Sequence, residues 1–157
     1  MPSLPLQGSS DAVHLRIGIV TSRFNEFITE QLVKGALEVL AKRGCHDENI
    51  RVVNVPGAWE LPIAAKALSA GCDAIVALGA VIRGDTPHFE YVAGGAADGL
   101  QRVSLETGVP IAFGVLTTDD MQQAMDRAGG KSGNKGAEAA EAAIEMANLL
   151  KHLRELP

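Results

Sequence analysis

The sequence has no excess of basic residues and no long apolar run. It contains 14 Lys and Arg against 19 Asp and Glu, which gives a net charge of -5 and an isoelectric point near 5.3. Nucleic acids and anionic membranes attract basic surfaces, so we expect neither as a partner. The longest uncharged apolar run, 74–82, is too short to cross a bilayer. The amino terminus lacks the basic start and apolar core of a secretory signal, and we expect a cytoplasmic protein.

Cysteine and metal-ligand patterns are also scarce. Cys45 and Cys72 stand alone, without a CxxC pair, and the four histidines are scattered. This predicts neither a disulfide framework nor a metal site, and both cysteines are expected to be free thiols in a reducing compartment.

Aromatic residues make up only 4% of the chain, so the position of each ring is informative. The six are Phe24, Phe27, Trp59, Phe89, Tyr91 and Phe113.

A single domain is expected from the 157 residues. Two prolines and a Gly-Ser-Ser-Asp run make residues 1–14 an N-terminal arm, extended or mobile, and residues 15–157 the domain. Within the domain, apolar runs of strand type alternate with segments of helical periodicity. The predicted strands are 15–21, 50–55, 74–79 and a fourth within 109–116. The predicted helices begin near 25 or 26, 61, 90 and 119, and a last helix runs to about 154 after a glycine-rich turn at 129–136.

This alternation predicts an α/β fold with a four-stranded parallel sheet between two layers of helices. Ligands of such sheets bind outside the carboxyl ends of the strands. The loops to examine are therefore 22–26, 56–60, 80–88 and 116–119. Phe24, Trp59 and Phe89 fall in or beside them, which favours a flat heteroaromatic ligand. The alternative is that these rings cover the end of the core.

The third loop, 80–88, contains the most residues that could bind a ligand or transfer a proton. Gly84 permits close approach of the backbone, and Thr86 with neighbouring N–H groups, that of Asp85 included, could cradle an anion. His88 follows Pro87 and is a candidate for proton transfer near neutral pH, although a lone histidine is often only a surface residue.

Two further charged residues are candidates. Glu60 could accept hydrogen bonds from sugar-like hydroxyls, and Arg127 could hold a phosphate. Each also suits its helix end through the helix dipole alone. Two nucleotide-binding motifs are excluded. Gly130-Lys131-Ser132 lacks the first P-loop glycine, and the first strand is not followed by GxGxxG.

The loop sequences, taken together, resemble those of the 6,7-dimethyl-8-ribityllumazine synthase family. The resemblance runs from about Ile17 to the last helix and rests on segments 22–25 (SRFN), 56–62 (PGAWELP), 79–89 (GAVIRGDTPHF), 126–129 (DRAG) and 133–136 (GNKG). It implies a flavodoxin-like fold of the lumazine synthase type. It also implies a transferase that condenses 5-amino-6-(D-ribitylamino)uracil with 3,4-dihydroxy-2-butanone 4-phosphate. That is the penultimate step of riboflavin biosynthesis, and no cofactor or metal is implied.

The resemblance also implies roles for individual residues. His88 is the proton-transfer residue, Phe24 stacks on the pyrimidine, and Glu60 binds the ribityl hydroxyls. The remaining substrate residues are Ala58, Trp59, Ala80, Val81, Ile82 and Phe113. The remaining phosphate residues are Asp85, Thr86, Arg127 and Lys135. Phe113 and Arg127 are expected to reach the site from a neighbouring subunit.

Assembly is the last expectation. The family forms pentamers, and the short turn at 128–135 favours an icosahedral shell, with riboflavin synthase as a possible associate. The arm could pair with a neighbour's sheet edge, or could be a disordered tail. Alternative functions are a flavin or lumazine carrier, an archaeal-type riboflavin synthase and, on fold alone, a signalling domain.

Overall fold

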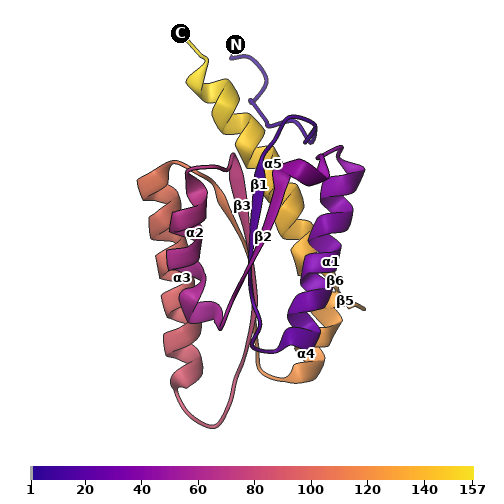
Figure 1. The fold of residues 1–157 in the computed structure, drawn as a ribbon, viewed down its shortest axis with the longest axis vertical. Helices are drawn as coiled ribbons and strands as arrows, with labels where there is room; N and C mark the ends of the chain where they lie inside the picture. Colours follow the sequence, from indigo (N-terminus) through magenta and orange to yellow (C-terminus); the bar gives the residue numbers. More distant parts are fainter. Residues whose placement is uncertain (1) are drawn as a thin grey trace.

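A computed structural model describes residues 2–157. Within them the chain forms a three-layer α/β/α arrangement around a parallel sheet of strand order β2-β1-β3-β4 (Figure 1). The strands of this sheet are β1 (Ile17–Ser22), β2 (Ile50–Val55), β3 (Ala74–Ile82) and β4 (Ile111–Thr118). The helices are α1 (Glu26–Lys42), α2 (Leu61–Ser69), α3 (His88–Thr107), α4 (Met121–Arg127) and α5 (Lys135–Arg154). Short 3-10 turns are η1 (Asp47–Asn49) and η2 (Ala58–Glu60). The predicted fold class is confirmed.

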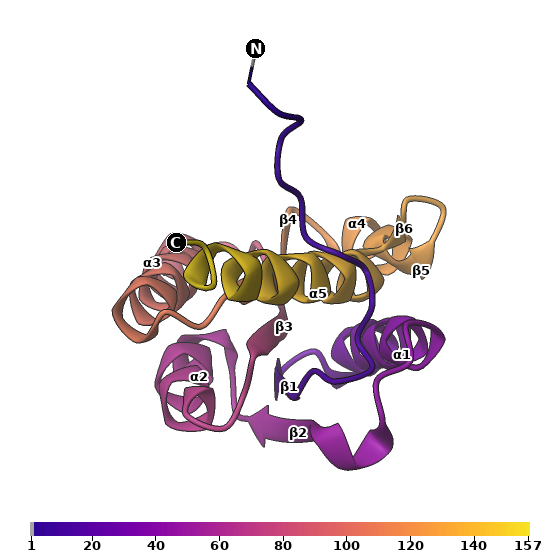
Figure 2. The same cartoon turned by 90° about the horizontal axis from the view of Figure 1, so that it is seen from above.

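The two faces of the sheet are covered by different helices. Helices α2 and α3 cover one face, and α1, α4 and α5 cover the other, as Figures 1 and 2 show from two directions. Strand β3 is buried on both faces because its side chains alternate between the two cores. Ala74, Val76 and Leu78 pack toward α1 and α5, whereas Ile75 and Ala77 pack toward α2 and α3.

Close packing of α1 on α5 depends on a glycine. Gly136 lies against the backbone of Leu32, where a Cβ would collide with the Leu32 carbonyl group. This contact seats α5 on the same face as α1. It therefore also fixes the place of the hairpin that precedes α5.

Several predicted boundaries were wrong. Strand β1 begins at Ile17 rather than Leu15, and β4 continues to Thr118, beyond the predicted limit of residue 116. Helix α4 is capped by Asp120, whose carboxylate accepts from the Gln123 backbone N–H (2.8 Å). Thr118 still belongs to the sheet, where it pairs with Ile82 of β3. The expected glycine-rich turn is in part a small antiparallel hairpin. Its strands are β5 (Ala128–Gly130) and β6 (Gly133–Asn134), and Gly129 and Gly133 adopt positive φ there.

The N-terminal arm is extended, and its second half is held on the domain. Asn148 on α5 donates to the carbonyl groups of Ser9 (2.8 Å) and Asp11 (2.9 Å). Ala12 is fully buried, and its N–H donates to the Arg43 carbonyl group (2.9 Å). Residues 2–6 run away from the body of the molecule, and Leu4 is exposed (Figure 2).

Candidate active site

A cavity of about 750 Å³ opens at the carboxyl ends of the strands. Its walls come from the β1–α1 loop, η2, the end of β3, the β3–α3 loop and the start of α3. The lining residues are Phe24, Pro56, Gly57, Ala58, Trp59, Glu60, Ala80, Val81, Ile82, Gly84, Thr86, His88, Phe89, Tyr91 and Val92. Three of the four loops predicted to carry the chemistry thus meet in one place.

The cavity exists because neighbouring strands differ in length. Pairing of β1 with β3 ends at Thr21 and Leu78, whereas β3 continues beside β4 to Ile82. Residues 80–82, expected in a loop, therefore belong to the strand, because β4 extends the pairing. Beyond β1 the Ala80 carbonyl group accepts from the Asn25 side chain instead (2.9 Å). Backbone groups of residues two apart in a strand point to the same side. The N–H and C=O of Ile82 therefore also face the side of β3 on which β1 has already ended.

Asn25 adopts a left-handed conformation (φ 64°) at the start of α1. Asparagine tolerates this conformation better than most residues. The turn places Phe24 at the cavity, where 72% of the Phe24 residue surface is exposed. An exposed ring at a cavity mouth offers a flat apolar face to a ligand.

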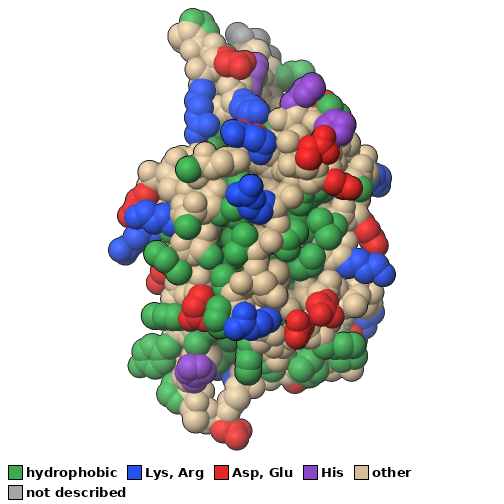
Figure 3. All heavy atoms as spheres, in the orientation of Figure 1, with side chains coloured by type: hydrophobic (Ala, Val, Ile, Leu, Met, Phe, Trp, Pro, Cys, Tyr) green, Lys and Arg blue, Asp and Glu red, His purple; other side chains and the backbone are tan. Residues whose placement is uncertain are grey.

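Trp59 forms a second aromatic wall. Its ring packs against Gly95 of α3, where an added Cβ would collide with the indole. The absence of a side chain at Gly95 therefore lets η2 and α3 approach each other. In Figure 3 hydrophobic side chains gather on the lower part of the molecule, at the end where β1 and β3 finish.

Glu60 is held in a defined orientation. Its Oε1 accepts from the Gly57 backbone N–H (2.9 Å). Only one carboxylate oxygen makes this contact, and the other remains available to a ligand hydroxyl. Gly57, Ala58 and Trp59 lie beside it on the same wall.

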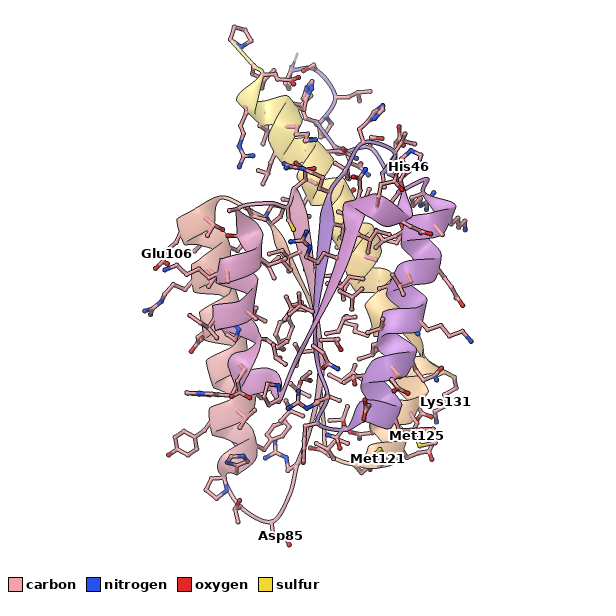
Figure 4. All side chains as sticks on the ribbon, viewed as in Figure 1. His46, Asp85, Glu106, Met121, Met125 and Lys131 are labelled. Atoms are coloured by element: carbon pink, nitrogen blue, oxygen red, sulfur yellow. The ribbon has the colours of Figure 1, made fainter. Side chains whose placement is uncertain are left out.

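The β3–α3 loop carries the remaining polar groups. His88 is the first residue of α3 rather than a loop residue, because the helix begins directly after Pro87. The Thr86 hydroxyl accepts from the His88 backbone N–H (3.5 Å), and both residues line the cavity. Asp85 lies at the far tip of the loop and is not part of the lining (Figure 4).

Arg83 lies at the beginning of this loop and is already paired. Its guanidinium contacts the Glu90 carboxylate, donates to Asp119 Oδ1 (3.0 Å) and lies 4.3 Å from the centre of the Phe89 ring. Hydrogen bonds to the two carboxylates raise the pKa of Arg83, and the hydrogen bond from Arg83 lowers the pKa of Glu90.

Three predicted site residues lie elsewhere in this chain. Phe113 is half-exposed on the edge strand β4. Arg127 ends α4, where its guanidinium donates to the Gln123 carbonyl group (3.0 Å), and Lys135 begins α5. Helices α4 and α5 cover the face opposite α3, so these side chains do not join the lining (Figure 1).

Sequence reasoning missed Tyr91 and Val92 as lining residues. Both follow His88 at the spacing of one helix turn, so they share its face of α3. A predicted helix that begins at His88 would have placed both residues on the same helix face as His88. The described residues contain no group of three or more His, Cys, Asp and Glu side chains that could hold a metal ion. None of the described helices is both long and apolar enough to span a membrane.

Comparison with known families agrees with this geometry. The model of the 6,7-dimethyl-8-ribityllumazine synthase family matches residues 14–151. Enzymes of this family are transferases that catalyse the penultimate step of riboflavin biosynthesis, the condensation given above. The match spans every strand of the parallel sheet and every wall of the cavity, and the chain therefore belongs to the 6,7-dimethyl-8-ribityllumazine synthase family.

Proposed function

We propose that the cavity at the carboxyl ends of the strands binds both substrates of the family reaction. The pyrimidine ring stacks on Phe24, and the backbone of residues 80–82 binds its polar edge. The ribityl chain lies along Ala58, Trp59 and Glu60. The observation that carries the proposal is that one cavity combines an exposed ring, an oriented carboxylate and His88.

The phosphate of the second substrate is proposed to lie at Thr86 and the backbone N–H of Asp85. A phosphate site normally includes a cation. None of the described residues that line the cavity is Lys or Arg, and nearby Arg83 is paired with two carboxylates. The missing cation is then supplied by a neighbouring subunit, through Arg127 with Lys135 close by. Phe113 of the same neighbour closes the site over the ring.

The proposed mechanism relies mainly on proximity. The substrate amine and ketone form an imine with loss of one water, phosphate is eliminated, and ring closure releases a second water. Holding two reactants together lowers such barriers by several kcal/mol without any covalent contribution from the protein. His88 transfers protons during phosphate departure and ring closure, a contribution on the order of 10²-fold.

The proposed assembly is a homopentamer, built further into an icosahedral shell. Strands β2 and β4 are open edges of the sheet, and such edges are normally covered. The short β5–β6 hairpin between α4 and α5 carries no insertion, which favours a shell. The exposed first part of the arm is available to pair with a neighbour's edge, and riboflavin synthase is the proposed associate. Two free cysteines suit the proposed cytoplasmic location.

A mixing assay tests the proposed reaction. Purified protein receives both substrates, and lumazine absorbance and phosphate release are followed against the uncatalysed background. We expect equal amounts of lumazine and phosphate, formed faster than background. Tight binding of lumazine or riboflavin without turnover would instead indicate a carrier and leave His88 without a catalytic role.

A further inference from the structure

Arg83 connects two elements that the backbone leaves separate at this end of the sheet. Its guanidinium contacts Glu90 in the first turn of α3 and Asp119 in the β4–α4 loop, and it lies against the Phe89 ring. We name these four residues the Arg83 clamp. One planar side chain thus holds two carboxylates and one ring at the same time, which is a geometry available to arginine and not to lysine.

The Asp119 end of the clamp is a fixed point. The Asp119 backbone N–H donates to the Gln123 side chain (2.7 Å), and the Thr118 hydroxyl donates to the Asp120 carbonyl group (2.9 Å). The Arg83 backbone N–H continues the sheet pairing by donating to the Thr118 carbonyl group (2.8 Å). The clamp therefore attaches the start of α3 to a loop that is itself well hydrogen-bonded.

The Glu90 end of the clamp lies next to the cavity lining. Glu90 sits between Phe89 and Tyr91 and two residues after His88, and these three neighbours line the cavity. Residues 84–88 are exposed, and a Cβ added at Gly84 would meet open space. Within this segment, the hydrogen bond between His88 and Thr86 is local and does not attach it to the sheet.

We propose that Arg83 is a positioning residue, which holds the phosphate loop and His88 in place through Glu90, Phe89 and Asp119. This inference rests on the proposed function of the cavity. The two carboxylates already neutralise the positive charge of Arg83, and this distinguishes Arg83 from a free cation that would bind phosphate. Exposed ion pairs contribute little to stability, whereas a displacement of about 1 Å at a site can reduce a rate by about a hundredfold.

The kinetic test compares Arg83→Met, Arg83→Lys, Glu90→Gln and Asp119→Asn with the wild type. For Arg83→Met we expect a fall of about tenfold or more in kcat/KM for the phosphate substrate, with little change in KM for the uracil substrate. Arg83→Lys recovers part of the loss, because lysine holds one carboxylate at a time. Glu90→Gln and Asp119→Asn change activity in the same direction as Arg83→Met, but less.

The carboxylate variants decide between positioning and direct binding. If Arg83 bound phosphate itself, freeing it from Glu90 or Asp119 would leave phosphate use unchanged or improve it, and the proposal would be overturned. The matched control is Glu106→Gln. Glu106 forms a similarly exposed ion pair with Lys66 at the other end of α3 (3.9 Å). We expect Glu106→Gln to leave kcat/KM for the phosphate substrate unchanged.

A second readout does not depend on the reaction. Hydrogen–deuterium exchange of the free protein is expected to rise in residues 84–92 of Arg83→Met and to stay unchanged at 100–108. Unchanged exchange in both segments would contradict the clamp even if activity fell. If the wild type made no lumazine, the proposed function would fail, while the exchange comparison would still test the clamp.

Discussion

His88 and Thr86 form one short unit at the mouth of the cavity. The backbone N–H of His88 points to the Thr86 hydroxyl, so the imidazole leaves the first turn of α3 beside the proposed phosphate position. Pro87 between them restricts the backbone further. The proposed proton-transfer role thus depends on one side chain whose placement is set by its neighbours.

We expect His88→Ala to retain measurable turnover. Proximity of the two substrates survives the change, and the loss is that of one acid–base group, on the order of 10²-fold in kcat. Initial rates of lumazine formation measure it, with His152→Ala on the exposed end of α5 as the control. Complete loss of activity in an intact assembly would contradict the proximity account.

The residues singled out from the sequence were those with distinctive side-chain chemistry. Phe24, Trp59, Glu60 and His88 were singled out from the sequence, and the fold brings all four to one cavity. The partners of Arg83 were not predicted. Asp119 lies 36 residues further along the chain, and only the β3–β4 pairing brings the two together.

At the scale of elements, hydrophobic periodicity predicts where strands and helices lie. The residues at which they end depend on the neighbouring elements with which they pair. The apolar run of β3 predicted a buried parallel strand correctly. Its extension through Ile82 depends on pairing with β4, which no local pattern reveals. The β5–β6 hairpin was missed for a similar reason, because a glycine-rich segment of eight residues shows no strand periodicity.

Asp73 joins three elements at the opposite end of the sheet. Its carboxylate accepts from the Arg16 backbone N–H (2.8 Å) and guanidinium (3.4 Å), and Lys151 of α5 lies 3.6 Å away. Burial opposes ionisation of Asp73, but the hydrogen bonds from Arg16 and the charges of Lys151 and Arg16 outweigh it and lower the pKa. The side chain is 13% exposed, so screening by water is limited.

This pKa shift predicts a pH-dependent contribution to stability. A carboxyl group with a lowered folded pKa stabilises the fold above its unfolded pKa, and the contribution disappears as the pH falls through the folded value. We expect Asp73→Asn to lower Tm at pH 7 by about 3–6 °C, since hydrogen bonds to a charged group contribute about 1.5 kcal/mol or more. Thermal unfolding from pH 7 down to pH 3 measures the difference, which shrinks below about pH 4. A difference that stayed constant across this range would contradict the shift.

At the scale of the whole molecule, one chain presents only part of the proposed site. Its cavity has aromatic walls, a carboxylate and a histidine, while Arg127, Lys135 and Phe113 lie outside it. The strand order leaves β2 and β4 as open edges, and Phe113 lies on one of them. No sequence pattern predicts a site shared between subunits, because spacing along one chain carries no information on a second chain. The family resemblance supplied that expectation.

Mixing two defective variants tests a shared site. In a ring where each site takes His88 from one subunit and Arg127 from the next, every site of pure His88→Ala or pure Arg127→Ala protein is impaired. After disassembly and reassembly of an equal mixture, about a quarter of the sites combine both intact residues, as expected for random order in a head-to-tail ring. With the phosphate substrate well below saturation, where both pure variants are slow, activity should then rise toward about a quarter of the wild-type value.

The control for this experiment is the same pair mixed without disassembly, together with light scattering of every sample to verify the same assembled mass. Activity equal to the average of the two separate variants, in fully reassembled protein, would mean that His88 and Arg127 do not serve one site across an interface. Activity near a quarter of wild type would require that interface, because neither variant contains a complete site of its own.

Arg127→Ala alone should mainly raise KM for the phosphate substrate, since its charge is the one proposed to replace the cation that the cavity of a single chain lacks.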